Sequence, residues 1–126
     1  MKQPDWVLRS VVLALQDLMI AEFGGVAGIR DVGVLDSALA RPENLFAYGN
    51  PSLCELAAAY AFGLVKKHPF TDGNKRIGFA VATIFLEING RKFSASEAEA
   101  VVQTLALAAG GIEEADYARW LGSVSS

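Results

Sequence analysis

The chain has 126 residues, of which 52% are hydrophobic and 20% charged, and its formal net charge is −3. That length is enough for one domain with its own hydrophobic core, so we expect a single domain over residues 1–126. The negative charge balance argues against direct, general binding to nucleic acid. The one cysteine, Cys54, excludes an internal disulfide, no apolar run is long enough to span a membrane, and the N-terminus lacks a signal-peptide pattern. We therefore expect a cytoplasmic protein.

Apolar spacing in the first half of the chain predicts two helices. Between Asp5 and Phe23 one helical face is apolar and consists of Val7, Val11, Ala14, Leu15, Leu18 and Met19. Gly24-Gly25 is expected to end this helix, because glycine takes the left-handed C-terminal conformation at little cost. After a glycine-rich loop, a short helix is expected from Val34 to Arg41, since Pro42 disfavours helical geometry in the residue before it. Residues 43–51 are expected to be irregular.

The middle of the chain carries stronger helix signals. Ser52 and Glu55 form a capping-box pattern, so a third helix should start there and run to Lys66 or Lys67. Its buried stripe is expected to be Leu53, Leu56, Tyr60 and Leu64. A fourth helix is expected from about Asn74 to Ile88, with apolar residues at helical spacing, namely Ile77, Ala80, Val81, Ile84, Phe85 and Ile88.

The C-terminal part predicts a short extended piece over residues 91–93 and one or two further helices. Ser94 or Ser96 can cap the fifth helix, whose inner face is expected to be Ala98, Val101, Val102, Leu105 and Ala108. A last helix carries Tyr117, Trp120 and Leu121, and the serine-rich tail is expected to fray. These signals together predict an all-α bundle of five or six helices around the fourth.

The polar chemistry of the chain is concentrated in one stretch, His68-Pro69-Phe70-Thr71-Asp72-Gly73-Asn74-Lys75-Arg76, where the fourth helix begins. A helix N-terminus offers unpaired N–H groups and partial positive charge to an anion. His68 is the only histidine, and its side chain suits proton transfer at neutral pH. Zinc ligation is the weaker interpretation, because zinc would need further His or Cys ligands and only Cys54 is available.

Asp72 and the residues after it allow both a structural and a functional interpretation. Asp72 could cap the fourth helix, or it could bind Mg²⁺ beside substrate phosphates. Gly73 allows close backbone approach to a ligand, and Asn74 could cap the helix or donate to a phosphate oxygen. Lys75 and Arg76 oppose the helix dipole at a cost of up to about 1 kcal/mol, which makes sense if an anion binds there.

The nine residues resemble the signature of the Fic/Doc (Fido) family, His-x-Phe-x-Asp/Glu-x-Asn-x-Arg, and in particular its death-on-curing (Doc) toxin branch. The segments 23–31 and 33–42, with Phe85-Leu86 and Asn89-Gly90, also resemble this branch, so the likeness covers nearly the whole chain. In the adenylyl-transferring Fic branch a glycine usually stands where this chain has Lys75. Gly73 in place of alanine and Gln16 in place of histidine depart from many Doc-like sequences.

The resemblance implies a single Fic/Doc-like helical bundle and a role for each motif residue. His68 would be the general base that takes the proton from a target hydroxyl. Phe70 would be the buried anchor of the loop, and Asp72 would hold Mg²⁺. The contacts to ATP and its phosphates would come from Gly73, Asn74, Lys75 and Arg76.

The branch residue Lys75 also implies which group is transferred. In Doc proteins a lysine there accompanies an inverted nucleotide, so that the γ-phosphate faces the acceptor. The implied reaction is phosphorylation of a threonine on elongation factor Tu by ATP, which halts translation. Phosphoryl transfer needs positioning, charge neutralisation and a base, and the motif contains residues for all three.

Two alternatives remain open, and a partner is implied. The same scaffold carries protein adenylyltransferases, and a chain with this motif could also act without catalysis, by binding an antitoxin and its operator complex. Many Fic proteins inhibit themselves with a Ser/Thr-x-x-x-Glu-Gly/Asn helix. Thr83 and Glu87 have that spacing, but Ile88 follows them and Thr83 lies inside the motif helix. We therefore expect an antitoxin that inhibits in trans by laying a helix into a groove near the site.

Overall fold

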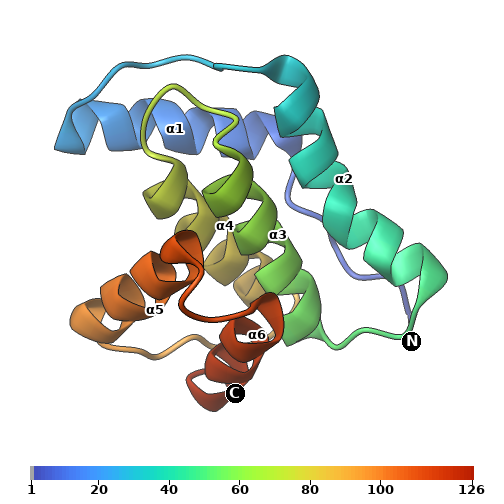
Figure 1. Ribbon diagram of the computed structural model, residues 1–126. Helices are drawn as coiled ribbons and strands as arrows, with labels where there is room; N and C mark the ends of the chain where they lie inside the picture. The colour runs from blue at the N-terminus through green and yellow to red at the C-terminus, as the bar shows by residue number, and fades with distance from the viewer. Residues whose placement is uncertain (1) are drawn as a thin grey trace.

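The computed structural model describes residues 2–126, which form a bundle of six helices (Figure 1). The helices are α1 (Arg9–Phe23), α2 (Val32–Tyr48), α3 (Leu53–Lys67), α4 (Asn74–Ile88), α5 (Glu97–Ala109) and α6 (Glu114–Ser123). The motif helix α4 contacts α1, α3 and α5, while α3 contacts α2, α4, α5 and α6. The prediction of an all-α bundle is confirmed, and α3 and α4 share its centre. None of the helices in residues 2–126 is long and apolar enough to cross a membrane.

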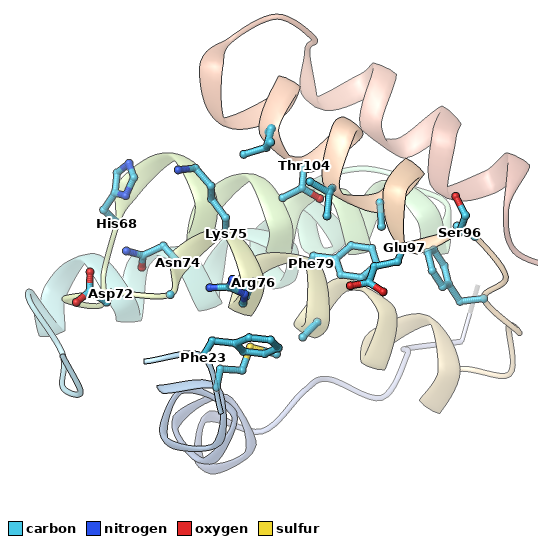
Figure 2. Close-up of a pocket in the computed structure, with 18 of the residues that line it drawn as sticks. Phe23, His68, Asp72, Asn74, Lys75, Arg76, Phe79, Ser96, Glu97 and Thr104 are labelled. Atoms are coloured by element: carbon cyan, nitrogen blue, oxygen red, sulfur yellow. The ribbon is translucent and has the colours of Figure 1, made fainter. Parts of the chain in front are cut away.

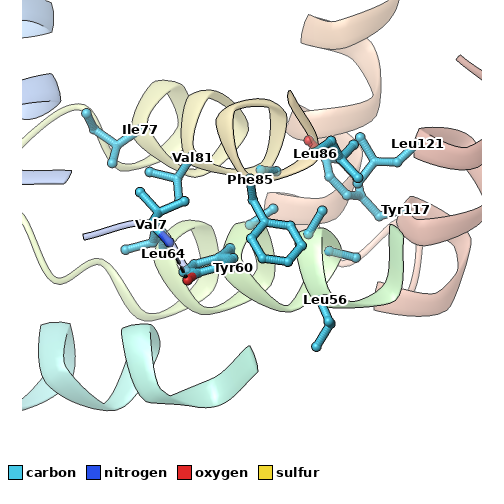
Figure 3. Close-up of a cluster of buried hydrophobic side chains, with 14 of the residues drawn as sticks. Val7, Leu56, Tyr60, Leu64, Ile77, Val81, Phe85, Leu86, Tyr117 and Leu121 are labelled. Carbon is cyan, nitrogen blue, oxygen red and sulfur yellow. Dashed lines mark hydrogen bonds between the residues drawn. The ribbon is translucent and has the colours of Figure 1, made fainter. Parts of the chain in front are cut away.

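The core forms where α3 and α4 pack against each other (Figure 3). Tyr60 of α3 and Phe85 of α4 lie with their ring centroids 5.3 Å apart. The helices approach closely because Gly78 has no side chain, and a Cβ added there would lie 2.5 Å from Cγ2 of Val65. On the α6 side, the same core includes Leu86, Tyr117 and Leu121. Close packing of this kind fixes the position of the N-terminus of α4, where the motif residues lie.

Two buried tyrosines in this core couple stability to pH. Burial raises the pKa of Tyr60 to about 12 and that of Tyr117 to about 12, from 10.0. Between pH about 10 and about 12, each tyrosine is mostly neutral in the folded chain and mostly ionised in the unfolded chain. Each therefore contributes stability below pH about 10, and this contribution decreases as the pH rises toward about 12.

We expect the free energy of unfolding to fall by up to about 1.4 kcal/mol per pH unit for each of the two tyrosines above pH about 10. Urea denaturation from pH about 8 to 11 measures this slope, and Tyr60→Phe and Tyr117→Phe should each flatten it. Tyr48, which is 91% exposed, is the matched control, and Tyr48→Phe should leave the slope unchanged. If the Tyr60→Phe protein had the same slope as the wild type, the raised pKa of Tyr60 would be contradicted.

The first helix begins later than predicted, at Arg9 rather than Asp5. The residues before Arg9 are not helical, and tertiary hydrogen bonds take the place of helical ones. Asp5 N donates to Oδ1 of Asn89 at 2.8 Å, and Asn89 Nδ2 donates to the carbonyl of Asp5 at 2.9 Å. Val7 N donates to the Tyr60 hydroxyl at 3.1 Å (Figure 3). The buried residues of α1 are Val12 and Gln16, whereas Leu18 of the predicted apolar face is 65% exposed.

The prediction that the second helix stops at Arg41 is wrong, because α2 continues through Pro42 to Tyr48. A proline inside a helix removes one backbone hydrogen bond and costs about 3 kcal/mol. Burial of Leu35, Ala38 and Pro42 offsets that cost. Ala38 lies against α3, where a Cβ added to Gly63 would lie 3.1 Å from its Cβ. Packing on α3 therefore keeps α2 helical beyond its local stop signal.

The predicted inner face of α5 is also wrong. Its buried residues are Ala100, Thr104 and Leu107, whereas Val102 and Leu105 are exposed. The hydroxyl of Thr104 lies 2.9 Å from that of Tyr117 in α6. This buried hydrogen bond favours the rotation of α5 that turns Thr104 inward, although the opposite face is more apolar.

The serine-rich tail does not fray. Lys92 N donates to the carbonyl of Ser126 at 2.7 Å, and Ser94 N donates to that of Val124 at 2.6 Å. Arg91 donates from Nε to Oγ of Ser125 and from Nη2 to its carbonyl. The extended piece predicted over residues 91–93 therefore exists, and its partner is the tail itself.

Candidate active site

His68 lies at the C-terminal end of α3, where the chain leaves the helix. Its backbone is left-handed, with φ 53° and ψ 58°. Within residues 2–126 it is the one non-glycine residue with a positive φ. Such a conformation costs of order 1–3 kcal/mol and persists only where surrounding contacts hold it. The imidazole is exposed at the edge of a cleft, as Figure 2 shows.

The α1–α2 loop (residues 24–31) lies beside the motif loop (residues 68–73), and Figure 1 shows the two loops next to each other. Arg30 N and Asp31 N both donate to the carbonyl of Pro69, at 2.8 and 3.1 Å. Thr71 N donates to the carbonyl of Gly28 at 3.1 Å. The Arg30 guanidinium reaches the end of α3, where Nε donates to the carbonyl of His68 at 2.6 Å and Nη2 to that of Lys67 at 2.9 Å.

Asp72 does not cap α4, so that interpretation is wrong. The N-cap position belongs to Gly73, in a left-handed conformation and with no side-chain cap. Asp72 Oδ2 instead accepts from Val26 N at 2.7 Å. Gly25 allows this approach, since a Cβ there would lie 3.1 Å from Cβ of Asp72. The buried Gln16 links both sides, because its amide donates to the Asp72 carbonyl at 3.4 Å and accepts from Gly28 N at 3.3 Å.

Phe70 and Asn74 close the motif loop on itself. Phe70 is 1% exposed, so it occupies the buried position predicted for the anchor. Asn74 is 7% exposed, and its side-chain amide bonds both backbone groups of Phe70: Oδ1 accepts from Phe70 N at 2.9 Å and Nδ2 donates to its carbonyl at 3.0 Å. These contacts give Asn74 a structural role beside the phosphate contact that remains predicted for it.

The N-terminus of α4 is suited to an anion. The first backbone bond of the helix runs from Ile77 N to the carbonyl of Gly73, so the N–H groups of Asn74, Lys75 and Arg76 precede the helical pattern. Lys75 and Arg76 are exposed, and neither joins an ion pair with another residue in 2–126. The Arg76 guanidinium lies over the ring of Phe23, 4.3 Å from its centroid. Phe23 thus orients one of the two cations toward the cleft.

A cleft of about 840 Å³ extends from this loop along α4 and α5 (Figure 2). Its polar end holds most of the predicted site residues, and its other end is mainly apolar. The polar residues at the motif end are His68, Asp72, Asn74, Lys75 and Arg76. The apolar end includes Phe79, Phe93, Ala95, Val101 and Leu105. The structure therefore gathers the predicted residues at one cleft, except Phe70, which lies beneath it.

Asp72 and the α4 N-terminus are the groups that could hold Mg²⁺ and a nucleotide. Within residues 2–126 Oδ1 of Asp72 has no hydrogen-bond partner, so one carboxylate oxygen can face a cation. The same residues contain no group of three His, Cys, Asp or Glu side chains placed to hold a metal. Mg²⁺ is commonly held by one or two carboxylates together with substrate phosphates. The donor set thus matches a metal that arrives with a nucleotide.

Sequence reasoning missed two residues that hold the site together. Gln16 departs from many Doc-like sequences, yet it is 2% exposed and bonds both loops. Arg30 lies in the glycine-rich loop after the first helix, where the sequence predicts no role for it, yet its side chain bonds the end of α3.

Comparisons with known proteins show which family the chain belongs to. Residues 6–86 match the model of the Fic/DOC family. Toxin Doc of Mycolicibacterium smegmatis is 45% identical over 76 residues, which is 58% of this chain and 58% of that protein. Protein kinase doc of Escherichia phage P1 is 34% identical over 80 residues, which is 63% of this chain and 64% of that protein. The matched part of this chain thus spans less than two thirds of either relative. The chain belongs to the Fic/Doc family.

Proposed function

We propose that the chain is the toxin of a toxin–antitoxin pair and transfers the γ-phosphoryl group of ATP to a protein hydroxyl. The observation that carries this proposal is the polar end of the cleft, where a histidine, a carboxylate and two cations surround the N-terminus of α4. The names of the two relatives, a toxin and a protein kinase, support it. The acceptor that the family resemblance implies is a threonine of elongation factor Tu.

The placement of the residues at the cleft supports the following proposed roles. His68 takes the proton of the acceptor hydroxyl as its oxygen bonds to the γ-phosphorus, and the bond from that phosphorus to the bridging oxygen breaks to release ADP. Lys75, Arg76 and the open N–H groups of α4 hold phosphate oxygens. Asp72 would hold Mg²⁺, which when bound neutralises phosphate charge. Preorganised donors of this kind stabilise the transition state because they need no reorganisation during the reaction.

The proposed antitoxin would inhibit transfer by covering this cleft. Thr83, the one candidate for a self-inhibiting helix in the sequence, lies in α4, and its hydroxyl donates to the carbonyl of Ala80 at 2.9 Å. The Thr83 hydroxyl is therefore bonded within its own helix. The apolar end of the cleft continues onto the exposed Val101 and Leu105 of α5, which gives an amphipathic helix a surface to cover.

The first test uses elongation factor Tu, Mg²⁺ and ATP labelled in parallel at the γ- and α-phosphates. Transfer of the γ-label alone is the expected result, and transfer of the α-label alone would instead assign an adenylyltransferase. Asp72→Asn should reduce transfer by about 10²-fold or more, because a metal ligand and its negative charge are lost. The matched control is Asp36→Asn, because Asp36 pairs with Arg9 on the surface of α2 and should leave the rate unchanged.

Two further outcomes decide between the remaining alternatives. No label on the factor, with the wild type still toxic to cells, would mean that the acceptor is a different protein. No label together with no toxicity would favour the non-catalytic role, in which the chain acts by binding its antitoxin.

A further inference from the structure

We propose that Arg30 is the positioning residue for the general base, because its guanidinium holds the backbone of His68 in the left-handed conformation. This inference rests on the function proposed above for His68. The carrying observation is a pair of hydrogen bonds, from Nε to the carbonyl of His68 at 2.6 Å and from Nη2 to that of Lys67 at 2.9 Å. Arg30 does not line the cleft, so it acts through His68 and not on the substrate.

The last carbonyls of α3 lie where the chain turns out of the helix, so they depend on donors from other segments. Helices that end on a left-handed residue usually have their last carbonyls bonded by the N–H groups of the next residues. Pro69 has no N–H, so the residue after His68 cannot make its share of these bonds. Arg30 supplies two N–H groups at the same helix end. Its positive charge also lies at the negative end of the α3 dipole.

The position of Arg30 is itself fixed from two directions. Its own N–H and that of Asp31 donate to the carbonyl of Pro69. Asp31 is the N-cap of α2, and its Oδ1 accepts from Val34 N at 3.0 Å. Three consecutive carbonyls, of residues 67–69, are therefore bonded by residues 30 and 31. The backbone of His68 is thus held by the start of α2, a segment remote from it in sequence.

The geometry requires an arginine at this position. The guanidinium is a rigid fork that can serve two carbonyls at once, whereas a lysine ammonium is a single point on a flexible stem. Lysine keeps the charge near the helix end but loses one of the two fixed contacts. We therefore expect Arg30→Lys to restore part of what Arg30→Ala removes.

The kinetic test compares Arg30→Ala, Arg30→Lys and Arg91→Ala in the transfer assay. Arg91 is a matched control, because it also donates from Nε and Nη2 to one neighbouring segment, but at the tail. We expect Arg30→Ala to lower kcat by about 10- to 100-fold and to leave KM for ATP within about twofold, because a displaced base slows the chemical step without removing phosphate contacts. Arg30→Lys should lie between it and the wild type, and Arg91→Ala should keep the wild-type kcat.

A spectroscopic test needs no activity. His68 is the only histidine, so histidine-selective ¹³C/¹⁵N labelling gives one residue's signals. The scalar couplings that depend on φ should report a positive φ in the wild type and in Arg91→Ala. In Arg30→Ala these couplings should shift toward those of a residue with negative φ, and in Arg30→Lys they should shift less.

The outcomes separate this inference from the proposed function. A wild-type kcat in folded Arg30→Ala, or an equal loss of kcat in Arg91→Ala, would overturn it. Unchanged couplings at His68 in Arg30→Ala would overturn it even if the wild type transferred no label to any acceptor. Altered couplings with an inactive wild type would support the positioning role and refute the proposed function alone.

Discussion

Replacing His68 with asparagine should lower the rate of transfer by about 10²- to 10⁴-fold, the usual contribution of a general base. Folding should be little affected, because asparagine tolerates the left-handed backbone conformation better than most residues. The imidazole is exposed, so its removal leaves no cavity. The measurement pairs the transfer rate with the free energy of unfolding from urea denaturation.

Two further substitutions at His68 separate the base from the backbone. His68→Gly should lose as much activity as the asparagine variant. It should be more stable than His68→Ala, because glycine adopts φ near 53° without strain. His68→Ala should also lose activity, and it should be less stable than His68→Gly by about 1 kcal/mol. Equal activity loss with this order of stability is the expected pattern. A variant without the imidazole that keeps the wild-type rate would show that another group takes the proton.

Gly78→Ala should destabilise the protein by about 1–3 kcal/mol, the typical cost of overpacking a core. Alanine normally stabilises a helix by about 1 kcal/mol relative to glycine, so the sign of the effect is reversed by packing. A Cβ at Gly78 would lie 2.5 Å from Cγ2 of Val65 and 3.2 Å from the carbonyl oxygen of Ala61. Valine is stiff about its first side-chain torsion, so α3 and α4 must move apart.

Two controls test this reason. Val65→Ala removes the nearest atom, so the double variant should be less destabilised than the sum of the single variants by about 0.5–3 kcal/mol. Gly122→Ala is the same substitution in α6, where the new Cβ would meet only Sγ of Cys54 at 3.8 Å. It should be neutral or stabilising. A neutral Gly78→Ala would contradict the close approach of the two central helices.

The sequence alone was sufficient where the signal and its effect lie within a few residues. The capping box of Ser52 and Glu55 starts α3 as predicted, with Ser52 Oγ accepting from Glu55 N and Glu55 Oε1 accepting from Ser52 N. The apolar spacing of α4 predicts its bounds, and Ile77, Val81 and Phe85 are buried. The motif residues could be named for the same reason, because their chemistry is local and their helix begins beside them.

Tertiary structure decided the features that depend on contacts between distant segments. Pro42 is a local stop signal, yet burial against α3 keeps α2 helical through it. The more apolar face of α5 is exposed, because the hydrogen bond between Thr104 and Tyr117 forms only when the opposite face turns inward. Asp72 is a good capping residue by type, yet its carboxylate accepts from Val26 N. In each case a partner remote in sequence offers more burial or a better hydrogen bond than the local signal.

The same distinction applies to the candidate site. Its chemical groups are local to residues 68–76, and sequence spacing was enough to name them. Their geometry depends on Gln16, Val26 and Arg30, which bond the motif loop from α1 and from the α1–α2 loop. The bonded residues are 38 to 56 positions apart in the sequence, so no local pattern could reveal these bonds. The chemical groups of the candidate site were therefore named from the sequence, and their positions were decided by the folded chain.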